Sequence, residues 1–196
     1  MNRILKETIY EDYGFKNYFQ YFQKCFFYPE IKLGCQWRKA QYYTTHKNIF
    51  LRFFWKFKWL MIRKKTKCQI SLRANIAPGL KLLHDGSRVI VSNVKIGRDC
   101  MIGINVIIGY SYSATEKRFE IPTIGDRVYI GHNVSIVGNI TVGNDVLIAP
   151  NTFVNRSVPD HSIVLGNNII IPKESPSTPY IKNLIQPSCS KRFFSI

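Results

Sequence analysis

A six-residue repeat runs from Ile90 to Pro159 and restricts the fold of this 196-residue chain more than any other feature. Read in sixes, it is IVSNVK, IGRDCM, IGINVI and IGYSYS, and after an interruption IGDRVY, IGHNVS, IVGNIT, VGNDVL, IAPNTF and VNRSVP. The first position is always Ile or Val, the second is usually Gly or Ala, and the fifth is mostly Val, Cys, Ile or Thr. A short fixed period of this kind is typical of a solenoid.

Each hexad is expected to form one flat face of the solenoid and to place its branched aliphatic side chain in a continuous core. The glycines are expected at tight corners, where a Cβ or a negative φ is costly. A helix is excluded, because a stripe at every sixth residue spirals around a helix of 3.6 residues per turn. The sequence therefore predicts an all-β solenoid, which we place over residues 68–171.

Two interruptions of the repeat mark candidate functional segments. Irregular hexads precede Ile90, starting at Cys68 with CQISLR, IAPGLK and LLHDGSRV. The last of these is two residues longer than a hexad, and the bulge that it predicts contains His84 and Asp85. Residues 110–121 (YSYSATEKRFEI) lack the core aliphatics and are expected to extrude as a loop, which either covers a neighbouring groove or is a plain surface insertion. After Pro159 the repeat fades, and the Pro/Ser-rich tail 172–196 is expected to be a partly ordered extension.

The N-terminal residues 1–67 are aromatic and basic, and they predict an α-helical extension with one or two early helices broken near Pro29 and Gly34. Residues 47–67 contain eight Lys/Arg and no acid. One helical face there is apolar, formed by Phe50, Phe53, Phe54, Phe57, Leu60 and Met61. Such a helix either lies on an anionic membrane surface or packs against the solenoid or a neighbouring subunit.

The net charge of +16 belongs mainly to this extension, because residues 1–67 carry 15 Lys/Arg against 4 Asp/Glu. A nucleic-acid-binding solenoid is therefore not expected. Five cysteines without a CxxC pair favour reduced thiols and argue against zinc. The N-terminus has no signal-peptide pattern and no apolar run reaches about 18 residues, so we expect a cytoplasmic protein. If residues 47–67 lie on lipid rather than on protein, the contact is peripheral and at the inner face of the membrane.

The hexads, the segment GLKLLHDGSRVIV and the closing stretch from IGDRVYIGHNVSIVGN to DHSIVLGN resemble the left-handed parallel β-helix acyltransferases. Within that group the chain is similar to serine O-acetyltransferases and to related capsule and lipopolysaccharide O-acetyltransferases. The resemblance spans about residues 68–171 and implies a homotrimer. It also implies acetyl-CoA as the donor, bound along the groove between adjacent solenoids, with direct acetyl transfer and no metal ion.

The resemblance implies that His84 is the general base, since it matches the histidine that these enzymes carry before a run of branched aliphatics. A neutral imidazole accepts the hydroxyl proton as the oxygen attacks the thioester. The resemblance also implies a pantetheine groove. The residues at the positions with which these enzymes line it are Gly109, Tyr110, Gly131, His132, Ala149 and Pro150. His132 stands at a usually small position, where it either contacts CoA or the acceptor or is solvated. The structural alternative for His84 is a turn histidine held by a backbone carbonyl.

The chain departs from serine acetyltransferases in three ways. Gln69 stands where those enzymes carry the acid that orients the base, and an amide cannot stabilise the imidazolium as a carboxylate does. Asp85, next to His84, is the alternative orienting group. The second family histidine is missing from RFEIP, and the long helical N-terminal domain is replaced by residues 1–67.

The leading hypothesis is an acetyl-CoA-dependent O-acetyltransferase that acts on a sugar hydroxyl of a surface polysaccharide precursor. Serine O-acetylation in cysteine synthesis is the runner-up, and a sugar N-acetyltransferase is a close variant. A hydratase of the carbonic anhydrase type uses the same solenoid, but His84, His132 and His161 lack the spacing of its zinc ligands. The last alternative is a non-catalytic scaffold.

Overall fold

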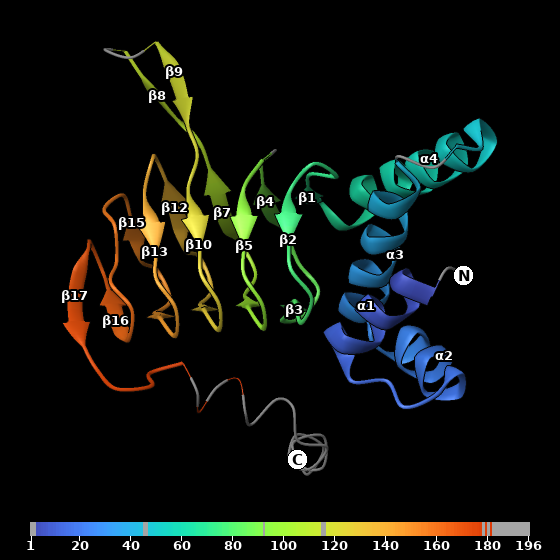
Figure 1. The fold of residues 1–196 in the computed structure, drawn as a ribbon, viewed down its shortest axis with the longest axis horizontal. Helices are drawn as coiled ribbons and strands as arrows, with labels where there is room; N and C mark the ends of the chain where they lie inside the picture. Colours follow the sequence, from blue (N-terminus) through green and yellow to red (C-terminus); the bar gives the residue numbers. More distant parts are fainter. Residues whose placement is uncertain are drawn as a thin grey trace.

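A computed structural model describes residues 3–44, 47–91, 93–114, 117–177, 179 and 181. It contains a β-solenoid with four α-helices at its N-terminal end (Figure 1), which confirms the predicted fold class. His46 and the end of the tail, with Cys189, lie outside the described residues.

Three parallel sheets form the faces of the solenoid. Sheet A contains β1 (Cys68–Ile70), β4 (Arg88–Ile90), β7 (Val106–Gly109), β12 (Ser135–Val137) and β15 (Phe153–Val154). Sheet B contains β2 (Asn75–Ile76), β5 (Lys95–Ile96), β10 (Thr123–Ile124) and β13 (Thr141–Val142). Sheet C contains β3 (Lys81–Leu82), β6 (Met101–Ile102), β11 (Tyr129–Ile130), β14 (Leu147–Ile148), β16 (Ser162–Leu165) and β17 (Ile169–Pro172), the last of which pairs antiparallel with β16.

The branched aliphatic side chains stack from coil to coil inside the solenoid, as the repeat predicts. In sheet A, for example, Ile90 pairs with Ile108 and Ile108 with Ile136, and all three are fully buried. Burial of one such side chain stabilises the fold by roughly 1.5–3 kcal/mol. The core is therefore a continuous column, and a change in one coil is felt by the coils on either side.

The hexad glycines avoid a Cβ clash, as the sequence predicts, but the prediction that they adopt the left-handed backbone is wrong. The left-handed backbone falls instead on the fourth position of the hexad, as at Asn105 and Asn133, with φ values of 55° and 58°. Asn and Asp adopt this conformation more readily than other residues with a side chain. The second-position glycines are needed because the next coil is too close: a Cβ on Gly131 would lie 2.7 Å from the Pro150 nitrogen.

Asparagine side chains form a ladder along the corner between sheets C and A. Asn105 Nδ2 donates to Asn133 Oδ1 at 3.1 Å, and Asn133 Nδ2 donates to Asn151 Oδ1 at 3.0 Å. Ser87 begins the ladder by donating from Oγ to Asn105 Oδ1 at 2.6 Å. Each rung satisfies two polar groups at once and fixes the register of successive coils at the edge that carries the candidate site.

Four helices precede the solenoid: α1 (Arg3–Tyr13), α2 (Tyr18–Phe27), α3 (Pro29–Tyr43) and α4 (Ile49–Thr66). Pro29 separates α2 from α3, as expected, since proline is well tolerated at the first position of a helix. The expected break at Gly34 is wrong, because α3 runs straight through it. Gly34 makes room for the Tyr13 ring of α1, whose hydroxyl oxygen would lie 1.8 Å from an added Cβ.

A buried ion pair fastens α1 and α3 to the first coil of the solenoid. Arg38 Nε donates to Asp12 Oδ2 at 2.8 Å, and its terminal nitrogens donate to the carbonyl oxygens of Ile76 and Ala77, both at 2.7 Å. Asp12 Oδ1 also accepts from the backbone N–H groups of Gly79 (2.8 Å) and Leu80 (3.1 Å). This network therefore docks α1 and α3 onto the end of the solenoid.

The face of α4 that packs inward is not the face with most of the phenylalanines. Trp59 is buried in the hydrophobic core, and Trp55 and Ile62 are partly buried against that core. The phenylalanine face points to solvent in a single copy, with Phe50 82% and Phe53 68% exposed. Packing of that face on the chain's own solenoid, one of the three options left open by the sequence, is therefore excluded.

The insertion 110–121 is a β-hairpin that projects from the solenoid (Figure 1), made of β8 (Ser111–Ser113) and β9 (Arg118–Glu120). Tyr110 and Phe119 hold its base together, with ring centroids 4.7 Å apart in an edge-to-face contact. Within the described part of the chain, no helix is long and apolar enough to cross a membrane.

Candidate active site

Two histidines meet at the corner that follows sheet C. Leu82, Ile102 and Ile130 are register partners, so the residues two positions after each strand form a column. This column contains His84, Ile104, His132 and Pro150. The rings of His84 and His132 reach across the intervening coil, with centroids 5.7 Å apart and planes at 37°. The sequence named both histidines but did not predict their contact.

His84 is exposed at the tip of the two-residue bulge, in the left-handed conformation with a φ of 60°. This backbone geometry is unusual for a residue with a side chain and needs support from its surroundings. The bulge therefore exposes the His84 imidazole at a corner of the solenoid.

Arg88 supplies that support from inside the solenoid. Its side chain is 1% exposed and occupies an inward position of β4 that elsewhere holds small or aliphatic residues. The guanidinium donates to the backbone oxygens of Gly86 (3.0 Å), His84 (2.9 Å) and Leu83. Burial lowers the pKa of Arg88, while Cys68, its register partner, counteracts that shift. Sequence reasoning missed this residue, although a charged side chain at an inward position was a readable signal.

His132 lies in a seat formed by the neighbouring coil. Its Nδ1 accepts a hydrogen bond from the backbone N–H of Ile104 at 3.1 Å. The seat depends on Gly103, because a Cβ there would lie 2.9 Å from Nδ1. Burial, followed by the proximity of His84 and Arg88, lowers the pKa of His132. The ring is therefore oriented, and its neutral form is favoured.

The two residues expected to orient His84 lie in different places. Gln69 points outward from β1, beside its register partner Val89, and lines a separate groove. Asp85 is exposed next to His84. Among the hydrogen bonds formed by the described residues, none joins either side chain to the His84 ring, so their orienting role stays a prediction.

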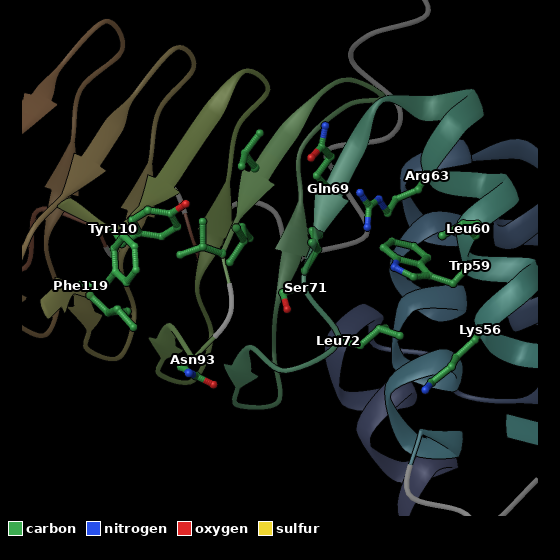
Figure 2. Close-up of a pocket in the computed structure, with 15 residues that line it drawn as sticks. Lys56, Trp59, Leu60, Arg63, Gln69, Ser71, Leu72, Asn93, Tyr110 and Phe119 are labelled. Carbon is green, nitrogen blue, oxygen red and sulfur yellow. The ribbon is translucent and has the colours of Figure 1, made fainter. Parts of the chain in front are cut away.

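The groove that contains Gln69 runs between α4 and the base of the hairpin, over the outer face of sheet A, and its volume is about 640 Å³. Figure 2 shows Lys56, Trp59 and Arg63 of α4 on one side and Tyr110 and Phe119 on the other. None of the described residues that line it is acidic. Its chemistry suits a ligand with an anionic group and an apolar or ring-shaped part.

The six residues expected to contact the pantetheine arm separate into two groups. Gly131, His132, Ala149 and Pro150 lie along the corner after sheet C, beside His84. Gly109 and Tyr110 lie at the other edge of sheet A, where the hairpin leaves the solenoid. A single copy of the chain therefore does not bring all six together.

His161 belongs to neither group. Its Nδ1 lies 3.2 Å from Asp145 Oδ2, and Ser177 donates to the other oxygen of that carboxylate. This cluster fastens the segment after β17 to the solenoid. In the ranges that the structure describes, no group of three or more His, Cys, Asp or Glu side chains is arranged to hold a metal ion.

The amino-acid sequence is similar to those of known acetyltransferases. Residues 121–156 match the family model described as Bacterial transferase hexapeptide (six repeats). Over 98 residues the chain is 38% identical to the serine acetyltransferase of Staphylococcus aureus strain Mu50, which covers 46% of this chain and 45% of that protein. Over 96 residues it is 35% identical to serine acetyltransferase 2 of Arabidopsis thaliana, covering 48% and 28%. The chain thus spans less than half the length of these curated relatives.

Solved structures share the fold over a larger part of the chain. The serine acetyltransferase of Brucella abortus strain S19 superposes with a TM-score of 0.68 at 22% identity, covering 87% of this chain and 68% of that one. The enzyme of Neisseria gonorrhoeae gives a TM-score of 0.71 at 21% identity, covering 89% and 69%. Over its solenoid, this chain is therefore similar in sequence to serine acetyltransferases, and it shares the β-solenoid fold of their solved structures.

Proposed function

We propose that the chain is an acetyl-CoA-dependent O-acetyltransferase of the serine acetyltransferase type, with His84 as general base. The observation that carries this proposal is the position of His84: an imidazole on a bulge braced by Arg88, in a solenoid homologous to those enzymes. A base must reach the acceptor while its backbone stays fixed, and an exposed imidazole on a braced bulge is suited to both.

In the proposed reaction the acceptor hydroxyl gives its proton to His84 while its oxygen bonds to the thioester carbonyl carbon. The carbon–sulfur bond then breaks, and the leaving thiolate takes the proton back from His84. The products are an acetyl ester and free CoA. His84 must be neutral at the start, and Gln69 and Asp85 are the candidates to orient its ring.

A homotrimer would complete the donor site. Gly109 and Tyr110 lie at one edge of sheet A, and Gly131, His132, Ala149 and Pro150 lie at the opposite one. If the edges of two copies face each other, the six residues line one groove that holds the pantetheine arm of acetyl-CoA. The same contact would place the donor thioester beside His84.

Serine is the first acceptor to test, because the relatives at 35–39% identity are serine acetyltransferases. The groove beside Gln69 favours a second candidate, the sugar hydroxyl of a phosphate-bearing polysaccharide precursor. Lys56 and Arg63 line that groove without a described acidic neighbour, whereas free serine carries an ammonium group as well as a carboxylate. Tyr110 and Phe119 offer flat surfaces on which a sugar ring packs.

The test is thiol release from acetyl-CoA by the purified full-length chain, with serine, nucleotide sugars and lipid-linked glycans offered in parallel. We expect saturable turnover with at least one hydroxyl acceptor. Turnover with serine alone selects the first acceptor, and turnover with a phosphate-bearing sugar alone selects the second. Failure to turn over any acceptor, together with no calorimetric binding of CoA, would leave a non-catalytic scaffold.

The exposed face of α4 is proposed to contact an anionic membrane surface from the cytoplasmic side. Phe50, Phe53 and Phe57 are each at least 65% exposed, and residues 47–67 carry eight basic residues and no acid. Two such helices from neighbouring copies would bring like charges together, whereas anionic headgroups attract them. Exposed aromatic side chains then enter the interface between headgroups and acyl chains.

Flotation with lipid vesicles checks this contact. The full-length chain should float with phosphatidylglycerol vesicles and stay behind with phosphatidylcholine vesicles. The double variant Phe53→Ser/Phe57→Ser should stop floating, while Tyr112→Ser on the hairpin, 59% exposed, should float as wild type does. Equal flotation with both kinds of vesicle would contradict selectivity for an anionic surface, and absence of flotation with either would contradict a membrane contact. A double variant that still floats but has a changed oligomer mass would assign this face to a neighbouring copy.

A further inference from the structure

His132 is held as a hydrogen-bond donor, although its residue type alone would allow either role. Its Nδ1 accepts from the Ile104 N–H at 3.1 Å, so the proton of the neutral ring must be on Nε2. The neutral ring is the favoured form, because burial and the nearby His84 and Arg88 lower the pKa of His132. The free edge of the ring therefore presents an N–H group.

That N–H group lies in the immediate surroundings of the proposed base. The ring centroids of His84 and His132 are 5.7 Å apart, and no hydrogen bond joins the two rings in the described structure. When an acceptor hydroxyl at His84 attacks the donor thioester, the thioester carbonyl would thus lie close to both imidazoles. A metal ion fits this pair poorly, because the outward nitrogen of His132 already carries the proton.

We propose that His132 is a second catalytic residue, whose Nε2–H donates to the thioester carbonyl oxygen as negative charge develops on it. This inference rests on the proposed acetyl transfer and goes beyond it, since His84 alone handles the proton. A preorganised neutral donor stabilises the oxyanion without being reorganised during the reaction. Gly103 belongs to the same device, because only a residue without a Cβ leaves the seat of the ring open.

Steady-state kinetics of His132→Ala and His132→Gln test the donor. Removing an oxyanion donor typically costs about 10²–10³ in kcat, so we expect His132→Ala to lose about 10²-fold. The KM for acetyl-CoA should change less than about threefold, since the contact is made mainly in the transition state. His132→Gln, which restores an N–H donor, should recover at least about tenfold of that loss. The matched control is His161→Gln, a substitution at a histidine that contacts Asp145 and lies outside this site.

A raised KM with unchanged kcat in His132→Ala, or equal rates for the Ala and Gln variants, would show that His132 only binds the donor or only packs. Nitrogen NMR of the wild-type chain with labelled histidine gives a second readout that needs no turnover. We expect the Nε2–H tautomer for His132 and a shift of that N–H when a non-reactive ketone analogue of acetyl-CoA is added. The Nδ1–H tautomer, or an unmoved signal at saturating analogue, would overturn the proposal even if acetyl transfer itself is established. If the wild type transfers acetyl to none of the acceptors although His132 has the Nε2–H tautomer, the result would instead count against the proposed function.

Discussion

His84→Asn is expected to lower kcat for acetyl transfer by about 10²-fold or more, because general-base catalysis contributes about that much. Asparagine is the informative substitution here. It accepts the left-handed conformation that His84 adopts at a φ of 60°, and it cannot take up a proton at neutral pH. The measurement is initial-rate thiol release from acetyl-CoA, with the best acceptor found for the wild type.

His84→Ala makes a useful companion, since it removes the base and also strains the bulge. We expect the two variants to lose activity alike, while only the alanine variant has a lowered melting temperature. The control is His161→Asn, because His161 also lies in the left-handed region, with a φ of 53°, but contacts Asp145 at a distant corner. Activity within a few-fold of wild type in His84→Asn would contradict the assignment of the base.

The solenoid was predictable from the sequence because its core is periodic. Every hexad meets the same local environment, so the buried positions repeat with the letters, as Ile90, Ile108 and Ile136 show. The reason for the glycines was less accessible. The distance from Gly131 to the backbone of Pro150 is set by the packing of one coil on the next, which no single hexad reveals.

The candidate site was predictable only in part. The bulge revealed His84, since it broke the period, but the contact with His132 depends on two side chains leaning across the coil between them. Arg88 braces the bulge from the inside, a role that depends on the carbonyl groups turning inward. The groove beside Gln69 depends on the angle at which α4 docks, and nothing in a linear repeat fixes that angle.

The docking of the helices supplies the second large effect. Arg38→Met is expected to destabilise the chain by about 3–5 kcal/mol, the usual cost of leaving a buried charge without its partner. Asp12 is 1% exposed, and burial raises the pKa of its carboxyl although Arg38 and two backbone N–H groups favour the ionised form. Without Arg38, the carbonyl oxygens of Ile76 and Ala77 also lose their donors. Urea unfolding, followed by circular dichroism at a helical wavelength, measures the change.

The chain contains its own matched control, because Arg3 and Glu7 form an exposed ion pair with the same 2.8 Å separation as Arg38 Nε and Asp12 Oδ2. Arg3→Met should leave the unfolding midpoint unchanged, since water and salt screen an exposed pair. The double variant Asp12→Leu/Arg38→Met should be more stable than Arg38→Met alone, because it removes the unpaired charge together with its partner. Equal midpoints for Arg38→Met and Arg3→Met would mean that the helices are held on the solenoid by apolar packing of Trp37 and Trp59, with the ion pair adding nothing.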